Sequence, residues 1–249
     1  MISEGTLSRV GRAMWQLASY DSLASTSDLA RELPAWNAVC ARRQSAGRGR
    51  FGRPFVSDEG GLWISAVLPA GAEAARWTGF SLMVGNHLLR LLRQLGLPEA
   101  RLRWPNDLMA RDKKLAGLLI EQGAQETLTV GLGLNVLNAP WEQDASLTHT
   151  TTRLTDLLPK APEISDLAVR VLDALADAHE AMRSGGFSAA VGEFNANLEA
   201  RLVEISLLEG GTARGDFTGL DHEGTLRLAD ASGLIHTVPH PHVERLTEI

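Results

Sequence analysis

The chain has 249 residues, 44% of them hydrophobic, which is enough for one large core and a small second one. This composition excludes a disordered or collagen-like protein, and the formal net charge of −6 argues against a general nucleic-acid binder. A lone cysteine, no signal-peptide pattern and no apolar run of bilayer-spanning length favour a cytoplasmic protein without a membrane segment.

The first part of the chain alternates strand-like and helix-like segments. Apolar, β-branched and aromatic residues predict strands at 15–20, 36–41 and 61–68. A short helix is expected between the first two strands. The hydroxyl groups of Ser25, Thr26 and Ser27 can cap its N-terminus. Apolar residues that recur every three or four positions predict a long amphipathic helix over 73–95, which Gly96 ends.

The rest of the chain divides into two parts. Strands at 101–104, 114–122 and 128–136 complete a sheet against the long helix, and helices near 164–182 and 187–198 follow. From residue 201 onward, short β-like runs between glycine-containing turns predict a small antiparallel barrel or sandwich. We therefore expect a larger domain over residues 1–198 and a smaller one over 199–249.

A loop rich in arginine and glycine, Gly47 to Arg53, is a local positive feature of this acidic chain. Glycines let backbone N–H groups approach an anion, and guanidinium groups bind carboxylates or phosphates through paired hydrogen bonds. A solvated turn is the alternative. A non-catalytic RNA or anion binder is a further alternative, although RNA-binding Arg/Gly tails lie in low-complexity sequence.

Three other segments contain candidate binding residues. Asn106 can hydrogen-bond a ligand and Asp107 can hold a hydrated magnesium ion or a ribose hydroxyl, although a type I turn explains the same letters. Lys114 can place an ammonium group against a phosphate, or it is a surface lysine before a buried strand. Two glycines inside one strand, Gly131 and Gly133, indicate either close approach by a ligand or tight packing.

Together these segments resemble the biotin protein ligase family, and the likeness extends over nearly the whole chain. Its Gly-Arg-Gly-Arg-x-Gly-Arg loop, Trp-Pro-Asn-Asp, Lys-x-x-Gly, Gly-x-Gly-x-Asn and Ser-Thr motifs are present as Gly47–Arg53, Trp104–Asp107, Lys114–Gly117, Gly131–Asn135 and Ser25–Thr26. Five motifs in the family's order and spacing make a specific match, whereas each alone would be weak.

The resemblance implies an α+β fold: a class II synthetase-like catalytic domain with a mixed or antiparallel sheet and helices on one face, followed by an SH3-like barrel. It implies an ATP-dependent ligase that forms biotinyl-5'-AMP, releases pyrophosphate and transfers biotin to a lysine of a biotin carboxyl carrier protein of acetyl-CoA carboxylase or a related carboxylase. Mg²⁺ is the implied cofactor. The chain resembles the monofunctional group without an N-terminal winged-helix domain, so no DNA binding is expected, and a homodimer is possible.

The resemblance also implies roles for individual residues. Lys114 and Arg50 are the implied catalytic residues. The implied biotin-binding residues are Ser25, Thr26, Ser27, Gln44, Gly47, Arg48, Gly49, Arg50, Lys114, Gly117 and Gly131. The implied ATP-binding residues are Arg48, Arg50, Arg53, Asn106, Asp107, Lys114 and Asn135, with Asp107 also the implied metal ligand. Three residues depart from the family's pattern: Arg103 for lysine, Ser27 for asparagine and Phe55 for tryptophan.

Some readings from other classes are weaker. A lipoate or octanoyl transferase would share the larger fold, but its motifs differ from the Arg/Gly loop. A metal site at His236, His240 and His242 is disfavoured because no cysteine or carboxylate pair lies at ligand spacing. Cys40 is expected in the core and His87 at the edge of a buried helix face.

Overall fold

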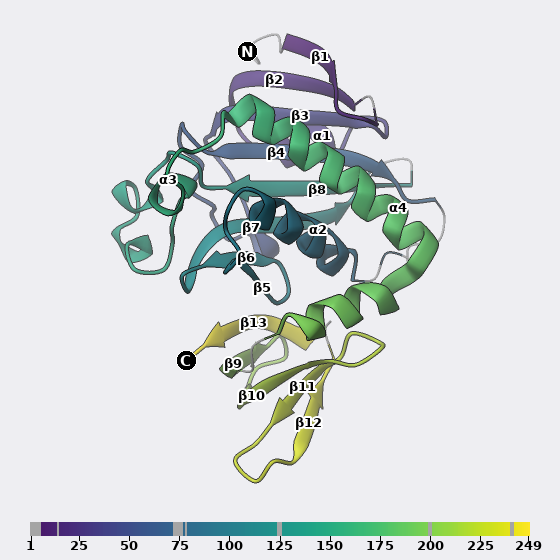
Figure 1. Ribbon diagram of the computed structural model, residues 1–249, viewed down its shortest axis with the longest axis vertical. Helices are drawn as coiled ribbons and strands as arrows, with labels where there is room; N and C mark the ends of the chain where they lie inside the picture. Colours follow the sequence, from purple (N-terminus) through teal and green to yellow (C-terminus); the bar gives the residue numbers. More distant parts are fainter. Residues whose placement is uncertain are drawn as a thin grey trace. The chain divides into compact units, whose positions relative to one another are not determined.

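The computed structural model describes residues 6–13, 15–71, 77, 79–123, 126–198, 201–239 and 242–249. The chain divides into two compact units, Met1–Ala181 and Met182–Ile249. The first unit contains an eight-stranded sheet with the order β1-β2-β3-β4-β8-β7-β6-β5 (Figure 1). Its strands are β1 (Thr6–Val10), β2 (Trp15–Leu23), β3 (Asn37–Gln44), β4 (Leu62–Pro69), β5 (Arg101–Arg103), β6 (Asp107–Ala110), β7 (Lys113–Gln122) and β8 (Thr127–Leu134). Neighbouring strands are antiparallel except β2 and β3, which are parallel, so the expected mixed sheet is confirmed.

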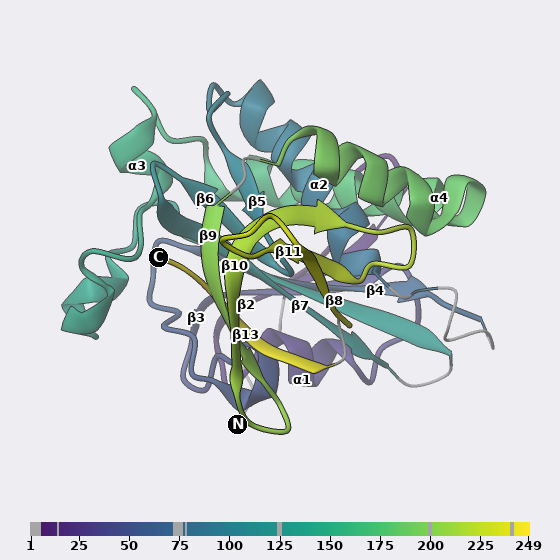
Figure 2. The same cartoon turned by 90° about the horizontal axis from the view of Figure 1, so that it is seen from below.

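Helices lie on both faces of this sheet. The helices are α1 (Thr26–Ala30), α2 (Phe80–Gln94), α3 (Leu154–Leu157) and α4 (Ile164–Ala196). Figure 2 shows α2 and the part of α4 before residue 182 on one face, with α1 on the other. The expectation of helices on one face therefore holds for the two long helices, whereas the five-residue α1 defines a second face. Within the part of the chain that the structure covers, no helix is both long and apolar enough to cross a membrane.

Strand β4 shows how the sheet separates a core from a second face. Successive side chains of a strand point to opposite sides, so alternate residues from Leu62 to Leu68 face the long helices and those from Trp63 to Val67 face α1. All seven are buried, which is why the segment reads as one apolar run. Val67 packs in a cluster with Ala30 of α1 and Leu23 at the end of β2. This cluster fixes α1, and with it Thr26 and Ser27, on the second face.

The structure differs from the sequence-based expectations at several element boundaries. Helix α2 begins at Phe80, directly after Gly79 at φ 75°, and residues 72–76 and 78 of the expected longer helix lie outside the described residues. Strands β1 and β6 were not predicted; β6 begins at Asp107, the last of the Pro-Asn-Asp letters, which favour a turn. The two helices expected after residue 164 form one element, α4, interrupted at Gly186, which has φ 67°.

The second unit holds a five-stranded antiparallel sheet, which confirms the small all-β part expected after residue 201. Its strands are β9 (Arg201–Leu207), β10 (Thr212–Leu220), β11 (Leu226–Ala229), β12 (Ile235–Val238) and β13 (Val243–Glu248), in the order β12-β11-β10-β9-β13. The end of α4 packs with it, because Asn195 Nδ2 donates to Leu220 O at 2.8 Å and Phe194 contacts Phe217 at 6.1 Å between ring centroids. The unit therefore starts within α4, whereas the boundary expected between 198 and 199 lies two residues beyond the end of that helix at Ala196.

Close packing between α2 and the sheet gives a first testable prediction. A Cβ atom at Gly85 would come 2.7 Å from Leu102 Cδ2 in β5, and both residues are buried. Gly85→Val is expected to lower the free energy of unfolding by about 1–3 kcal/mol through overpacking. Gly192→Val is the matched control, because no atom lies within 4 Å of that exposed helix position. Equal midpoints for both variants in urea unfolding would contradict the expected contact.

Candidate active site

A strip of sheet surface without side chains lies on the α1 face. Gly131 and Gly133 lie two positions apart on β8, so they share one face, and Gly133 pairs with Gly117 of β7. A Cβ atom at Gly131 would come 2.9 Å from Ser27 Oγ, and one at Gly133 would come 2.5 Å from the ring of Phe55. These three glycines, here called the glycine floor, let other groups approach the backbone closely.

Five polar side chains form a connected network beside the glycine floor. Thr26 donates from its backbone N–H to Gln44 Oε1 at 2.7 Å, and its hydroxyl oxygen lies 2.8 Å from Ser65 Oγ. Ser65 Oγ also lies 3.0 Å from Ser27 Oγ, and Gln44 Nε2 donates to Ser57 Oγ at 2.9 Å. The four hydroxyl-bearing residues are buried, so each must keep a hydrogen-bond partner. We call these five residues the hydroxyl–amide network.

The arginine- and glycine-rich segment forms a narrow loop next to this network. Phe55 N–H donates to Gly47 O at 2.8 Å, and Gly49 N–H donates to Arg53 O at 2.8 Å. A Cβ atom at Gly47 would come 2.4 Å from Ser57 Oγ and 2.6 Å from Phe55 O. Only glycine therefore allows the loop to approach the network this closely.

Asp107 lies between two cations beside Gly117. Its Oδ1 is 2.7 Å from Lys114 Nζ, and its Oδ2 accepts from Arg103 Nη2 at 2.6 Å. Burial alone would raise the pKa of Asp107, but Lys114 and then Arg103 outweigh it and hold the pKa below its ordinary value. Two cations and one anion leave a net charge of one positive unit, and an ammonium bonded once to Asp107 keeps two N–H donors for a ligand.

This cluster predicts a pH dependence of stability. Because the pKa of Asp107 is lower in the folded state, its contribution is present above the unfolded value of about 4 and is lost as pH falls through the folded pKa. The difference in Tm between the wild type and Asp107→Asn is expected to be largest near neutral pH and to shrink below about pH 4. Asp112→Asn, which changes a mostly exposed carboxylate paired with Arg101, serves as the control. A difference for Asp107→Asn that stays constant from pH 7 to pH 2 would refute the linkage.

Arg50 is a partly desolvated cation near the same cluster. Its guanidinium carbon lies 4.8 Å from the centroid of the Phe51 ring. Burial and then the charge of Arg53 lower the pKa of Arg50, while Asp107 opposes this shift. An arginine pKa starts so high that Arg50 stays protonated at neutral pH. The Asp107 cluster therefore places positive charge beside the glycine floor, because Lys114 Nζ lies close to Gly117, and Arg50 lies within electrostatic reach of Asp107.

Known proteins match the part of the chain that contains these residues. The model of the Biotin/lipoate A/B protein ligase family matches residues 17–135, which include the glycine floor, the network and the Asp107 cluster. A biotin–[acetyl-CoA-carboxylase] ligase of Paracoccus denitrificans is 33% identical over 216 residues, which cover 80% of this chain and 85% of that protein. The chain belongs to the biotin/lipoate A/B protein ligase family.

Two further relatives extend the comparison over most of the chain. The bifunctional ligase/repressor BirA of Bacillus subtilis strain 168 is 28% identical over 236 residues, covering 88% of this chain and 70% of that protein. The solved structure of a biotin protein ligase from Aquifex aeolicus, in complex with biotin and ATP, has a TM-score of 0.81 and 26% identity, and covers 94% of this chain and 99% of that one. The expected fold class is thereby confirmed across both units.

Most of the expected site residues meet on the α1 face. The glycine floor, the network, the loop and the Asp107 cluster bring together Thr26, Ser27, Gln44, Gly47, Asp107, Lys114, Gly117 and Gly131. Ser25 is buried at the N-cap of α1, without a side-chain hydrogen bond to that helix. Arg53 is exposed and lies 5.8 Å from the Phe51 ring. The ligand each of these residues binds stays a prediction.

Asn106 and Asn135 have structural partners in this protein. Asn106 Nδ2 donates to Leu118 O at 2.7 Å, which ties the segment before β6 to β7. Asn135 Nδ2 donates to Thr152 O at 3.0 Å, and Asn135 Oδ1 accepts from Asn138 Nδ2 at 2.9 Å. Both amides therefore support the backbone around the site, and their role toward a nucleotide stays a prediction.

Sequence reasoning missed Ser57 and Ser65 as site residues, and it gave Asp28 and Glu121 no role there. Ser65 carried a recognisable signal, because it is the one hydroxyl-bearing residue in the apolar run of β4 and a buried hydroxyl needs a partner. Asp28 and Glu121 bind Arg48, which lies 20 and 73 residues away along the chain, so no local pattern indicates either pairing.

Magnesium, the cofactor implied by the family, would find one carboxylate here. Among the residues that the structure describes, no three His, Cys, Asp or Glu side chains lie together as a metal-binding group. Both oxygens of Asp107 already contact cations. Proteins commonly bind Mg²⁺ through one or two carboxylates together with substrate phosphates. The donor set therefore fits an ion held mainly by the phosphates of ATP, with Asp107 nearby.

Residues weighed as alternative sites have other partners. His236 Nε2 lies 2.8 Å from Asp230 Oδ2 in the second unit, and His240 lies outside the described residues. Cys40 Sγ donates to Ser19 Oγ at 3.2 Å, and burial raises the pKa of this thiol, so it is a poor nucleophile at neutral pH.

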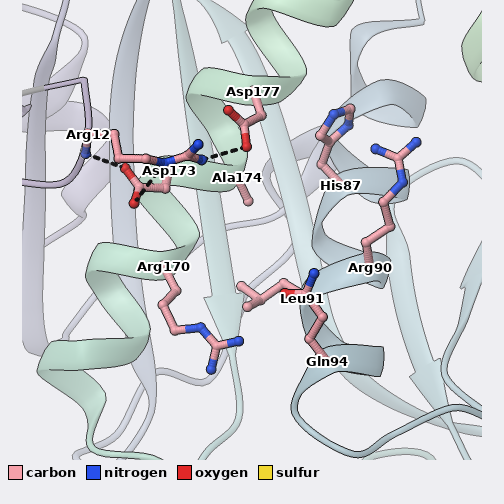
Figure 3. Close-up of a pocket in the computed structure, with 9 residues that line it drawn as sticks. All are labelled: Arg12, His87, Arg90, Leu91, Gln94, Arg170, Asp173, Ala174 and Asp177. Atoms are coloured by element: carbon pink, nitrogen blue, oxygen red, sulfur yellow. Dashed lines mark hydrogen bonds and ion pairs between the residues drawn. The ribbon is translucent and has the colours of Figure 1, made fainter.

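A pocket of about 520 Å³ lies between α2 and α4, on the sheet face opposite the glycine floor (Figure 3). Arg12 lines it from the β1–β2 turn, donating to Asp177 Oδ2 at 2.7 Å, while its backbone N–H donates to Asp173 Oδ1 at 2.6 Å. These bonds tie the turn to α4. None of the residues expected to bind biotin or ATP lines this pocket, so its size alone does not make it the active site.

Proposed function

We propose that this chain is an ATP-dependent biotin ligase, which activates biotin to biotinyl-5'-AMP and transfers it to a lysine of a biotin carboxyl carrier protein. Family membership supports the ligase chemistry. The proposed substrate pair matches the Aquifex aeolicus protein, whose solved complex contains biotin and ATP.

The hydroxyl–amide network is the observation that favours biotin over lipoate. The ureido ring of biotin carries a carbonyl oxygen and two N–H groups, which can exchange hydrogen bonds with the hydroxyls of Thr26 and Ser27 and the amide of Gln44. The dithiolane ring of lipoate offers no comparable donors and would leave buried polar groups poorly partnered. Ser25, Gly47, Gly49, Gly117 and Gly131 would form the surrounding walls and floor.

Adenylation requires two anions to meet. A carboxylate oxygen of biotin attacks the α-phosphorus of ATP, the bond from that phosphorus to the bridging oxygen breaks, and pyrophosphate leaves. Lys114 and Arg50 would offset the repulsion and stabilise charge on the α-phosphate, because both are fixed cations in a partly desolvated site. Arg48, Arg53, Asn106 and Asn135 would contribute directed hydrogen bonds. Magnesium bound to the phosphates would supply further charge neutralisation when present.

Transfer consumes the adenylate. The neutral amine of the acceptor lysine attacks the biotinyl carbonyl carbon, the bond from that carbon to the phosphate oxygen breaks, and AMP leaves as the amine loses a proton. Lys114 would stabilise the departing phosphate without forming a covalent bond itself. The acceptor is proposed to be the carrier domain of acetyl-CoA carboxylase, in line with the name of the Paracoccus denitrificans relative.

A substrate comparison tests this function. The protein is mixed with ATP, Mg²⁺ and either biotin or lipoate, and ATP–pyrophosphate exchange is measured. We expect exchange with biotin, formation of biotinyl-AMP and label on a purified carboxyl carrier domain. Exchange with lipoate and none with biotin would reject the proposal.

A further inference from the structure

The guanidinium of Arg48 is held by two carboxylates from different elements. Arg48 Nη2 donates to Asp28 Oδ1 of α1 at 2.7 Å. Arg48 Nη1 and Nη2 donate to Glu121 Oε2 of β7 at 3.1 and 3.0 Å. Asp28, Arg48 and Glu121 are called the Arg48 clasp below.

The clasp joins the loop to both sides of the α1 face. The backbone of Arg48 forms a β-bridge with Pro54 across the loop. Contacts that hold the Arg48 side chain therefore also hold the loop Gly47–Arg53 in place. Glu121 lies two strand positions from Leu119, which pairs with Gly131, and therefore faces the glycine floor. Asp28 follows Ser27 in α1. The clasp thus closes the loop over the network and the glycine floor.

The two carboxylates differ in burial, and therefore in how strongly each is expected to hold Arg48. The side chains of Arg48 and Glu121 are 22% and 30% exposed, whereas Asp28 is 48% exposed and also pairs with Arg31. Water screens an exposed pair more strongly, so Glu121 is expected to hold Arg48 more tightly than Asp28 does.

The net charge of the clasp indicates that it positions the Arg48 side chain and does not itself attract an anion. Two carboxylates and one guanidinium sum to one negative unit, so the clasp does not attract an anion by net charge. Arg48 has five N–H donors; Nη1 donates to both oxygens of Glu121, Nη2 donates to Asp28 and Glu121, and the Nε–H has no acceptor among the residues that the structure describes. The carboxylates orient the guanidinium and leave the Nε–H for a ligand.

We propose that Asp28 and Glu121 are positioning residues, which act through Arg48 to keep the loop closed and so retain the adenylate until an acceptor lysine arrives. The inference rests on the proposed ligase function. The adenylate is a mixed anhydride, and if it escapes it reacts with water and with any exposed amine. A loop held closed from two sides would prevent these side reactions.

The test separates adenylate formation from adenylate release. In Glu121→Gln we expect pyrophosphate release in the first turnover to stay within about twofold of wild type, because Lys114 and Arg50 are unchanged. Release of preformed biotinyl-AMP should accelerate on the order of tenfold, with more label on a bystander protein such as serum albumin. Asp28→Asn should show a smaller acceleration, and Glu121→Asp should restore part of the retention.

Controls decide between the possible outcomes. Glu32→Gln changes a carboxylate that is 73% exposed and should release adenylate like the wild type. In the double variant Glu121→Gln/Arg48→Gln, release should be no faster than in Arg48→Gln alone, because both changes open the same clasp. Wild-type release rates in both Glu121→Gln and Asp28→Asn, or equal loss of formation and retention, would overturn the clasp and leave the ligase function standing. A wild-type protein that forms no adenylate would overturn both proposals.

Discussion

Replacing Lys114 by alanine is expected to slow adenylation by about a hundred- to a thousandfold while the protein stays folded. The ammonium lies 2.7 Å from Asp107 and 5.4 Å from the Phe55 ring centroid, so it is held in one position beside the glycine floor. Its removal deletes a fixed charge where negative charge builds up on the α-phosphate. Arg103 still pairs with Asp107, so the carboxylate keeps a partner and the fold should survive. The measurement is single-turnover pyrophosphate release with saturating biotin and ATP.

The adjacent lysine provides a matched control. Lys113 Nζ lies 3.5 Å from Thr148 O, and no ion pair ties it to Asp107. Lys113→Ala should therefore adenylate biotin at close to the wild-type rate, and its Tm should lie above that of Lys114→Ala, which loses the contact with Asp107. Equal rates in the two variants would remove Lys114 from the mechanism.

Replacing Gly131 by valine is expected to weaken biotin binding by about a hundredfold or more, because overpacking and lost hydrogen bonds each cost roughly 1–3 kcal/mol. A new Cβ atom would come 2.9 Å from Ser27 Oγ and 3.5 Å from Ser65 Oγ, so the side chain would enter the hydroxyl–amide network. Valine suits a β-strand, and the backbone of β8 should be retained. Binding of biotin and of ATP is measured separately by calorimetry.

The predicted pattern is selective. ATP binding should change little, because the charged residues Lys114 and Arg50 lie on other segments. Gly192→Val adds the same side chain at an exposed position of α4 and should bind biotin normally. Wild-type affinity for biotin in Gly131→Val would show that Gly131 is not part of the biotin site.

The sequence predicted much of the fold because its local signals agree with the tertiary structure. The apolar run of β4 and the apolar residues that recur every three or four positions in α2 are buried in the structure. The sequence pattern and the packing therefore agree in these two elements. The start of α2 was less predictable, since apolar spacing continues on both sides of Gly79 but the backbone there is left-handed. Strand β6 was hidden by Pro-Asn-Asp letters that favour a turn, although pairing with β7 makes it a strand.

The sequence motifs indicated which segments form the candidate site, but they did not indicate which side chains contact each other there. Glycines at 131 and 133 indicated a close approach to β8, and the structure places Ser27 and Phe55 at those positions. The two-carboxylate clasp on Arg48 joins α1, the loop and β7, and such contacts depend on tertiary structure and leave no periodic trace. Ser27 stands where the family's pattern has asparagine, and only the structure shows that its hydroxyl contacts Ser65.

A crystal structure with biotin and a non-hydrolysable ATP analogue would show where both substrates bind. We expect the ureido ring at the hydroxyl–amide network over Gly131, with the biotin carboxylate and the α-phosphate both within hydrogen-bond distance of Lys114. Ligands bound elsewhere, such as in the pocket between α2 and α4, with Lys114 still bonded only to Asp107, would contradict this expectation.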